Sequence, residues 1–518
     1  MLRRVLLFMC CCVIESVSAL EAPPDLQFDV VRYEVTGSNA MSSAEVTNIL
    51  KPYLGRHYSL AGLSSAVEEL ERHLKKKGYS FHRVVLIPQS LRNGIVKLHI
   101  YEFKLGALKV SGNQYFSDEN IKHSLPSLIE GQAPNTRLLN KSLSIANHHP
   151  DKSLQMIFKE GEKQNTIDVE LKVADKTPAT GYVQLANTGS ENSGETRLGL
   201  GYQYSNLFNK DHVANINYST STEQPENVSQ WVLSYSMPFY DIGDKLSFYY
   251  SDSKVESLTL FENNPGLFDV SGIGSVLGMR YTLGFLNIKS FKQKVTLGLD
   301  VKEFNNRISS ADFGGAIDES TVRSGPVSIE YEFSRPKGRS PFALSVSYHH
   351  NQIDDEAYLL QDRAPDTNWG LTRYRAQYDM PLSDWLLRFK LSGQYADRAL
   401  ISAEQFTVGG SRSVRGYEEV AALGDRGHYF NLELWKKIKS SHLSGAVFYD
   451  SAQTELTELT DTNISAPLKN NLASMGVGLR WSWSRYLAVS ADLAQVQQDF
   501  GETLKGDSKL HFNMTYKY

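Results

Sequence analysis

The chain has no cysteine outside one N-terminal run, no long apolar stretch and no excess of basic residues. Cys10, Cys11 and Cys12 lie in a segment that we expect to be removed, so the mature chain is expected to hold neither a disulfide framework nor a metal site built on cysteine. A net charge of -4 gives no reason to expect a nucleic-acid partner. Runs of about 20 apolar residues are missing, which excludes a bundle of membrane helices. A membrane barrel is still allowed, because only alternate residues of its wall face lipid.

Residues 1–19 have the composition of a cleaved signal peptide. Arg3 and Arg4 supply positive charge, 5–14 is an apolar core, and small residues precede a cut after Ala19. The apolar core is too short to span a bilayer as an anchor. We therefore predict that the mature chain is exported.

Residues 27–102 change their hydrophobic period in a fixed order, which predicts a βααββ module. The expected strand, two helices and two strands lie at 29–36, 43–53, 60–77, 81–87 and 95–101. In the second helix, Leu63, Leu70 and Leu74 fall on one face, and Gly78 follows its end.

The same order returns more loosely in residues 103–175, which predicts a tandem array of two modules of about 75 residues. The expected elements lie at 104–110, 117–125, 137–146, 153–158 and 166–173. Neither module contains a phosphate-binding loop, a zinc motif or a nucleophile elbow, so a catalytic role is not expected. His123, His148 and His149 lack metal-ligand spacing and are expected to be solvated.

From residue 180 to residue 518 helical spacing disappears, and apolar residues alternate with small or polar ones, as at Leu198, Leu200 and Tyr202. A soluble β-sandwich also alternates. Here, however, strands begin or end in aromatic residues such as Trp231, which is typical of a bilayer boundary. About sixteen segments fit this pattern, and an even number suits a closed barrel without an open edge in lipid. We predict a 16-stranded antiparallel transmembrane β-barrel.

The last segment alternates to a terminal aromatic through Phe512, Met514, Tyr516 and Tyr518. This ending resembles the signal by which the outer-membrane assembly machinery recognises a last strand. The resemblance implies that the barrel-assembly machinery, periplasmic chaperones and outer-membrane lipid are partners of the chain.

The stretch FTVGGSRSVRGY, residues 406–417, interrupts the alternating segments. Gly409 and Gly410 allow backbone turns that are closed to other residues. Its tip carries Val414, Arg415, Gly416 and Tyr417. An arginine in a surface loop is usually only a solvated charge. The loop therefore has to be interpreted together with the segments that flank it.

Together with GDRGHYFNLEL, this loop resembles the signature of the barrel-assembly and two-partner secretion superfamily. The two modules resemble POTRA domains in GRHYSLAGLSSAVEELERHLKKKGYSFHRVVLIPQSLRNGIVKLHIYE and NHHPDKSLQMIFKEGE. Two such modules before a 16-stranded barrel resemble the two-partner secretion B-component of haemolysin-activator type. The resemblance implies an outer-membrane pore with periplasmic POTRA domains. These domains would capture an unfolded secreted polypeptide by β-augmentation, without a cofactor.

In that superfamily the loop arginine pairs with an acid in a wall motif of the form F-x-D-x-G, which corresponds here to Phe448–Ala452. Alternation places Phe448 and Asp450 on the lumen face. The resemblance thus implies an ion pair between Arg415 and Asp450, which either gates the pore or only braces the barrel. Ala452 stands where the motif has glycine, so the motif does not determine the wall geometry beside this pair.

Many relatives begin with a helix that plugs the pore, whereas only residues 20–27 separate the expected cut from the first strand. We therefore expect the Arg415 loop to be the main occlusion of the resting pore. An assembly factor for other outer-membrane proteins is the nearest alternative. An outer-membrane enzyme is disfavoured because no Ser-His-acid or metal constellation is apparent, and a passive porin because it has no use for POTRA domains. The family's expected client is a large β-helical exoprotein.

Overall fold

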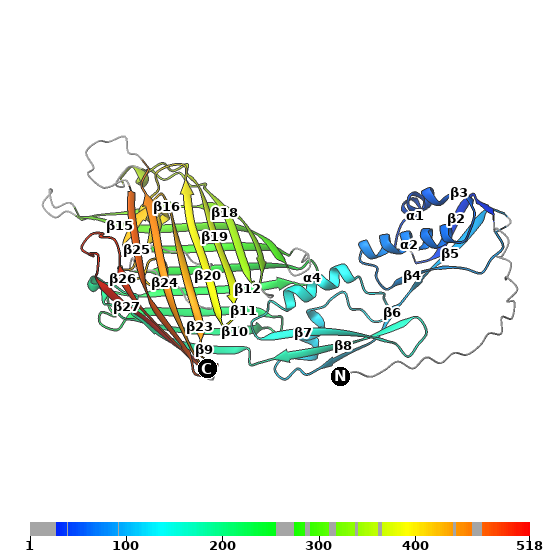
Figure 1. Cartoon of the computed structure of the whole chain (residues 1–518), viewed down its shortest axis with the longest axis horizontal. Helices are drawn as coiled ribbons and strands as arrows, with labels where there is room; N and C mark the ends of the chain where they lie inside the picture. Colours follow the sequence, from blue (N-terminus) through cyan, green and yellow to red (C-terminus); the bar gives the residue numbers. More distant parts are fainter. Residues whose placement is uncertain are drawn as a thin grey trace, which may run out of the picture. The chain divides into compact units, whose positions relative to one another are not determined.

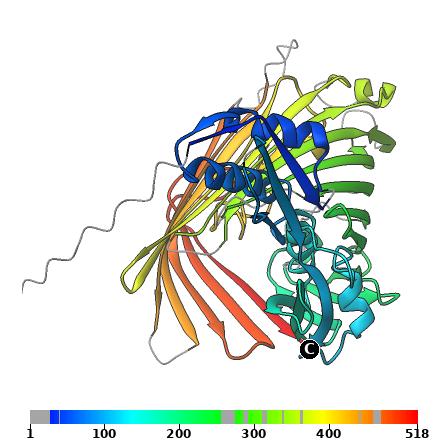
Figure 2. The same ribbon diagram turned by 90° about the vertical axis from the view of Figure 1, so that its right-hand side faces the viewer.

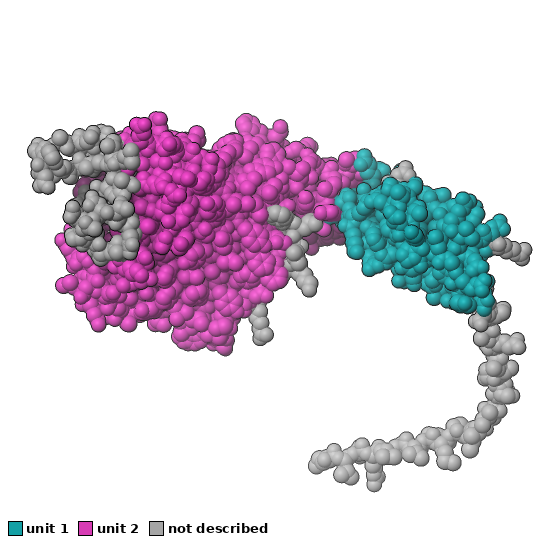
Figure 3. Space-filling model, turned by 90° about the horizontal axis from the view of Figure 1, so that it is seen from above, with its two compact units in different colours: residues 1–104, 131–136, 162–166 teal, residues 105–130, 137–161, 167–518 magenta. Residues whose placement is uncertain are grey.

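The computed structural model describes residues 27–518 apart from 39, 92, 255–273, 285–290, 310–316, 337–339, 361–364, 439–441 and 458–468 (Figure 1). The expected signal peptide lies outside these residues. The chain divides into two compact units (Figure 3). One unit contains the first module up to Lys104 with residues 131–136 and 162–166, and the other contains the rest of the second module with the barrel. Among the helices in the described ranges, none is long and apolar enough to cross a bilayer.

The first module has the predicted order of strands and helices. Its elements are β1 (Phe28–Val30), β2 (Arg32–Gly37), α1 (Ser43–Leu50), η1 (Lys51–Tyr53), β3 (Gly55–His57), α2 (Ala61–Lys76), β4 (His82–Leu86) and β5 (Ile95–Glu102). The sheet order is β2-β5-β4, with β2 parallel and β4 antiparallel to β5, and β1 pairs with β3 in a small ribbon that was not predicted. α1 ends earlier than expected because Pro52 cannot donate a helical hydrogen bond. The apolar face of α2, including Leu63 and Leu70, is fully buried.

The second module repeats this order with β6 (Lys104–Ser111), α3 (Asp118–His123), α4 (Thr136–Ala146), β7 (Lys152–Glu160) and β8 (Thr166–Asp175). Its sheet order is β6-β8-β7. Ser117 caps α3 by accepting a hydrogen bond from the Asn120 backbone N–H, as its sequence suggested. Tyr240, from a barrel turn, belongs to the same buried core as Ile121 and Leu171. The second module therefore shares its core with the barrel.

The barrel is closed and antiparallel, and its strands follow one another around the wall (Figure 2). The segments are β9 (Ala179–Ala186), β10 (Arg197–Leu207), β11 (His212–Ser221), β12 (Gln230–Phe239), β13 (Asp244–Ser253), β14 (Gly274–Gly284), β15 (Lys292–Ser309), β16 (Ile317–Ser324), β17 (Pro326–Arg335), β18 (Phe342–Asn351), β19 (Gly370–Leu382), β20 (Trp385–Ala396), β23 (Arg426–Lys437), β24 (Leu443–Glu455), β25 (Lys469–Ser482), β26 (Leu487–Val496) and β27 (Ser508–Lys517). β16 and β17 both pair with β15 and form one wall strand interrupted at Gly325, which confirms the predicted sixteen strands. β27 pairs with β9 and closes the wall.

The two faces of the wall differ as the alternation predicted. On β24, Val447 and Tyr449 are 54% and 39% exposed, whereas Phe448 and Asp450 are 5% and 0% exposed. The outer face is therefore apolar and suited to lipid, and polar groups line the lumen. In the last strand, Met514 and Tyr516 also lie on the outer face, as does the terminal Tyr518, and Phe512 is half-buried beside them.

A buried ion pair attaches the second module to the barrel turns. Lys152 Nζ lies 2.6 Å from Asp211 Oδ2 in the turn between β10 and β11, and both side chains are 0% exposed. Tyr240 donates to the same carboxylate oxygen at 2.6 Å, and Asn120 donates to the other oxygen at 2.9 Å. Burial opposes ionisation, but the charge and hydrogen bond of Lys152 outweigh it and lower the pKa of Asp211. These contacts identify the module-facing end of the barrel.

The expectation that His149 is solvated is wrong. Its side chain is 3% exposed, and its Nε2 donates to the Ser205 carbonyl at 2.7 Å. Its Nδ1 accepts from the Asp151 backbone N–H at 3.2 Å, so the ring is in its neutral form. Burial lowers the pKa of His149 accordingly. The carbonyl that accepts its hydrogen bond lies on barrel strand β10, which sequence spacing could not indicate.

We predict that Asp211→Asn loosens the second module from the barrel. The substitution leaves the Lys152 ammonium buried without a carboxylate, which typically costs about 3–5 kcal/mol. Limited proteolysis and the thermal midpoint of the detergent-solubilised protein would measure this loss. Lys159→Met is the matched control on the same module, because Lys159 pairs with Glu170 but is 60% exposed. Equal protease resistance of the two variants would contradict the prediction.

Candidate functional site

The stretch that carries Arg415 lies in the connection between β20 and β23, residues 397–425, and its tip is buried. Its two limbs form the short antiparallel pair β21 (Phe406–Val408) and β22 (Ala422–Gly424). Val414, Arg415 and Tyr417 are 0%, 4% and 1% exposed. The loop thus folds against the inner wall, as its resemblance implied, rather than into solvent.

Three glycines let the loop turn and approach the wall closely. Gly409 has φ of 113°, and a Cβ there would lie 2.5 Å from the Glu418 carbonyl oxygen. Gly410, with φ of 79°, would place a Cβ against the Glu419 carboxylate. Gly416 has φ of 99° and leaves only 3.2 Å between a Cβ and Val496 Cγ2 on β26. Side chains at these positions would strain the backbone and displace the tip.

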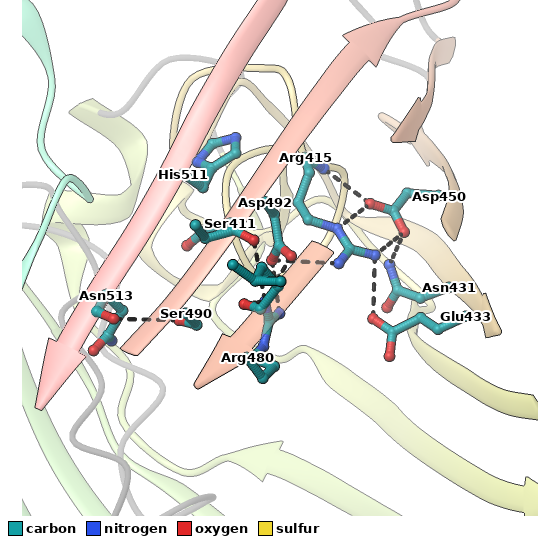
Figure 4. Close-up of polar contacts among 12 residues, drawn as sticks. Ser411, Arg415, Asn431, Glu433, Asp450, Arg480, Ser490, Asp492, His511 and Asn513 are labelled. Atoms are coloured by element: carbon teal, nitrogen blue, oxygen red, sulfur yellow. Dashed lines mark hydrogen bonds and ion pairs between the residues drawn. The ribbon is translucent and has the colours of Figure 1, made fainter. Parts of the chain in front are cut away.

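Arg415 makes a bidentate contact with Asp450 on β24 (Figure 4). Its Nε donates to Oδ2 and its Nη2 to Oδ1, both at 2.7 Å. The Arg415 backbone N–H donates to Oδ2 as well, at 3.2 Å. The Arg415 guanidinium also lies over the Phe448 ring, with Cζ 3.4 Å from its centroid. The structure therefore brings together the loop arginine and both wall residues that the sequence singled out.

Further carboxylates surround the same guanidinium. Nη2 lies 3.2 Å from Glu433 on β23, and Nη1 lies 3.5 Å from Asp492 on β26. Arg480 donates to both oxygens of Asp492 at 2.7 Å. Asn431 donates to Asp450 at 2.8 Å, which supports its orientation. Sequence reasoning did not identify these partners, although alternation along each strand would have placed their side chains in the lumen.

The charges of this network nearly cancel. Lys390 lies 3.9 Å from Glu433, so three cations face three carboxylates. Removing Arg415 would leave the three carboxylates with two cations inside a partly dehydrated lumen. Because an unpaired buried charge is costly, we expect the network to act as a unit.

Backbone and hydroxyl contacts extend the attachment to two further wall strands, β25 and β27. The Gly416 N–H donates to His511 Nε2 on β27 at 2.9 Å, which requires a neutral His511 ring with its proton on Nδ1. Tyr417 donates to the Gln498 carbonyl at 2.6 Å and lies 3.1 Å from the Ala473 carbonyl on β25. Together with the ion pairs to Glu433, Asp450 and Asp492, these contacts join the tip to every strand from β23 to β27.

An apolar cluster surrounds the charged contact and includes the position that departs from the superfamily motif. Ala452 is 4% exposed and packs with Val414, Tyr417 and Leu472. Its strand keeps a regular register with both neighbours, as in Tyr429↔Ala452 and Ala452↔Leu472. The alanine is therefore accommodated without a break in the wall.

A second ion pair holds the start of the loop against a different part of the wall. Glu404, in η5 (Ser402–Glu404), accepts from Lys302 Nζ on β15 at 2.8 and 3.0 Å, and from Ser324 Oγ on β16 at 2.9 Å. Glu404 is 1% exposed. Leu400 packs beside it in a buried cluster with the fully buried Trp369. No local motif indicated this contact.

The two attachments lie on separated parts of the wall. β15 and β16 carry one, and β23 to β27 carry the other, with β17 to β20 between them on one side of the closed barrel. The loop is therefore held against the inner wall at two separated places.

A closed barrel with an apolar outer face, an internal arginine loop and α/β modules before it defines a protein-transporting outer-membrane barrel of the POTRA type. Residues 165–481 match the family described as haemolysin secretion/activation protein ShlB/FhaC/HecB, and residues 28–102 match the ShlB-type POTRA domain. The chain belongs to this haemolysin secretion/activation family. The predicted family, fold and outer-membrane location, with periplasmic POTRA domains, are confirmed.

Known relatives and structures agree over most of the chain. The heme/hemopexin transporter protein HuxB of Haemophilus influenzae (strain 86-028NP) is 22% identical over 91% of this chain and 84% of its own length. The outer membrane transporter CdiB of Dickeya dadantii (strain 3937) is 22% identical, over 86% and 79%. The solved CdiB from Escherichia coli has a TM-score of 0.73 at 17% identity and covers 98% of this chain and 93% of its own. BamA from Haemophilus ducreyi lacking POTRA domains 1-3 shares the fold at a TM-score of 0.53 and 14% identity, over 95% of this chain and all of its own.

We predict that Gly416→Ala loosens the loop tip, because a positive φ costs about 1–3 kcal/mol for a residue with a Cβ. The mature chain is expected to contain no cysteine, so Val414→Cys would introduce one buried thiol as a reporter. Gly416→Ala should raise the labelling rate of that thiol at least about fivefold, which corresponds to about 1 kcal/mol. Gly445→Ala is the matched control on β24, where a Cβ would come no closer than 3.9 Å to another atom. Unchanged labelling would contradict the prediction.

Proposed function

We propose that this chain secretes a polypeptide exoprotein through its barrel and that the Arg415 loop gates the passage. The single observation that carries the proposal is the loop itself. It packs on the polar inner face of the wall and is held there by ion pairs at two separated places. A buried loop inside the barrel occupies part of the space through which a client would pass.

Client capture would occur on the POTRA sheets. β4 and β2 are the edges of the first sheet, and β6 and β7 are the edges of the second, so each of them pairs with only one neighbour within its sheet. An edge strand offers backbone donors and acceptors to an extended peptide, and side-chain pockets then give specificity. This mode suits an unfolded client, because an unfolded chain can supply an extended segment at many places along its length.

The Arg415 network provides the gate with a defined closed state. Its bidentate geometry and burial make the closed position specific. When the loop moves away, the three carboxylates and their cations separate and are hydrated by water that enters with the client. This hydration lowers the free-energy cost of separating the ions, so opening is favoured when client is present.

Further partners follow from this function. The client would be a large β-helical exoprotein, kept unfolded in the periplasm by chaperones. The outer-facing Phe512, Met514, Tyr516 and Tyr518 would present the last strand to the barrel-assembly machinery before the barrel reaches lipid. An assembly factor for other barrels would differ in one observable: its depletion would lower many outer-membrane proteins, whereas depletion of this chain should remove one protein from the culture medium.

We expect Arg415→Ala and Asp450→Ala each to reduce export while barrel abundance is unchanged, because each leaves part of the network unpaired. The double variant should export at least as much protein as the single variant with the lower export, because both residues act in one contact. Arg415→Lys should be intermediate, because lysine keeps the charge but not the bidentate geometry. Comparison of the culture medium by quantitative mass spectrometry measures export.

Lys469→Ala is the control for this series. Lys469 forms a wall ion pair with Glu455 at 3.3 Å, and its side chain is 60% exposed, so neither charge is buried in the network. This substitution should leave export intact. If the Arg415 and Asp450 variants also export normally, the pair only braces the barrel.

Deleting residues 406–420 should raise conductance in planar bilayers, because it removes the tip from the lumen. We expect wild-type channels to be closed for most of the recording and the deleted channels to be open. A wild-type channel as conductive as the deletion would show that the loop does not occlude the pore.

A further inference from the structure

A basic groove lies between the second module and the module-facing rim of the barrel. Its volume is 350 Å³. Lys141 and His148 of the second module line one side, and Lys245, Lys292 and Lys294 of β13 and β15 line the other. Both sides belong to the same compact unit, so the groove is part of one folded body.

Close packing gives this groove a fixed shape. Ser142 on α4 donates to the Tyr240 carbonyl at 2.7 Å, in the turn between β12 and β13. In the same turn Gly243 has φ of 78°, and a Cβ there would come within 2.9 Å of Lys141 Cβ. Helix α4 and the turn between β12 and β13 therefore contact each other beside the groove. This contact fixes the distance between the lysines on its two sides.

The groove is continuous with the lumen. A larger lumen cavity of 450 Å³ shares five lining residues with it, which are Lys245, Thr282, Lys294, Glu332 and Ser334. Beyond them the lumen cavity reaches Arg280, Arg375 and Lys390. Cations thus line the whole way from the face of the second module to the inside of the barrel.

Positive charge is in excess at the groove. Four lysines line it against one carboxylate, Glu332, which pairs with Lys294 at 2.7 Å. Within the described part of the chain, no carboxylate lies within 4 Å of Lys141, Lys245 or Lys292. Among the described residues, the charges of Lys141, Lys245 and Lys292 therefore have no direct counter-ion.

His148 responds to this positive field. Partial loss of hydration beside the barrel rim, and then the charges of Lys292, Lys294 and Lys245, lower the pKa of His148, although its hydrogen bond to the Ser144 carbonyl opposes the shift. The ring is therefore neutral at neutral pH, and Lys292 Nζ lies 3.4 Å from its Nε2. The groove remains selective for negative charge without a further cation from histidine.

We propose that this groove is the entrance to the barrel for the client and that it engages acidic segments of the extended chain. The inference rests on the proposed function and adds the chemistry of the partner. A chain that extends at about 3.3 Å per residue can place successive carboxylates along the lysines, since Lys292 and Lys294 lie on one face of β15 about 7 Å apart. The cations deeper in the lumen are mostly paired, as Arg280 is with Asp300 at 2.5 Å, so attraction is strongest at the entrance.

Binding of a defined peptide tests the groove directly. The probe is a fluorescent 20-residue peptide rich in glutamate and glycine, added to the detergent-solubilised full chain, with a glutamine-for-glutamate peptide of the same length as its control. We expect the acidic peptide to bind at least tenfold more tightly than the glutamine peptide, and to lose this advantage at high salt. Equal affinity for the two peptides would overturn the proposal.

Substitutions then locate the site. Lys141→Gln, Lys245→Gln and Lys292→Gln combined should weaken binding of the acidic peptide at least tenfold, whereas Lys159→Gln on the exposed hairpin of the same module should not. A triple variant that binds the acidic peptide normally would overturn the proposal. So would a triple variant that loses only its affinity for nanodiscs containing phosphatidylglycerol, because the groove would then be a lipid headgroup site.

Export separates this inference from the proposed function. The triple variant should assemble normally and slow the appearance of the exported protein in the medium, while Lys159→Gln exports at the wild-type rate. Normal export by the triple variant would contradict the proposal that the groove is the client's entrance. It would not contradict the proposal that the chain secretes an exoprotein. If depletion of the wild-type chain removes no protein from the medium, the proposed function itself fails, whatever the peptide binding shows.

Discussion

The structure of the lumen depends on one constraint: a buried guanidinium must remain paired. Arg415 is 4% exposed and has lost nearly all of its water, so the protein surrounds it with carboxylates from three wall strands and an aromatic ring. Two of those carboxylates have a further cation beside them, Lys390 at Glu433 and Arg480 at Asp492. The loop, its glycines and the inner faces of β23, β24 and β26 are arranged around this requirement.

The same physical logic recurs where the second module meets the barrel. Lys152 and Asp211 are buried as a pair, and Glu404 with Lys302 holds the start of the loop. In each case a carboxylate on a connecting segment, Asp211 or Glu404, pairs with a lysine on a β-strand. Buried ion pairs add little net stability but strongly penalise wrong arrangements. They therefore fix where the module and the loop rest.

Sequence patterns predicted the elements better than the contacts between them. Alternation and helical spacing are local, so both modules and the sixteen wall strands could be predicted, while the interruption at Gly325 could not. Asp450 was identified because a family motif marks it. Asp492 was not, because it lies 77 residues from Arg415 and resembles any inward-facing acid, and Lys302 lies 102 residues from Glu404 with no motif at either end.

The contact between Gly416 and His511 joins the loop to the final strand of the chain. β27 pairs with β26 on one side and with β9 on the other, and the pairing with β9 closes the wall. Before that pairing forms, β27 is an edge strand supported on one side alone. The surface that the loop tip contacts is therefore fixed on both sides only once the wall is closed, which couples the final position of the tip to closure of the barrel.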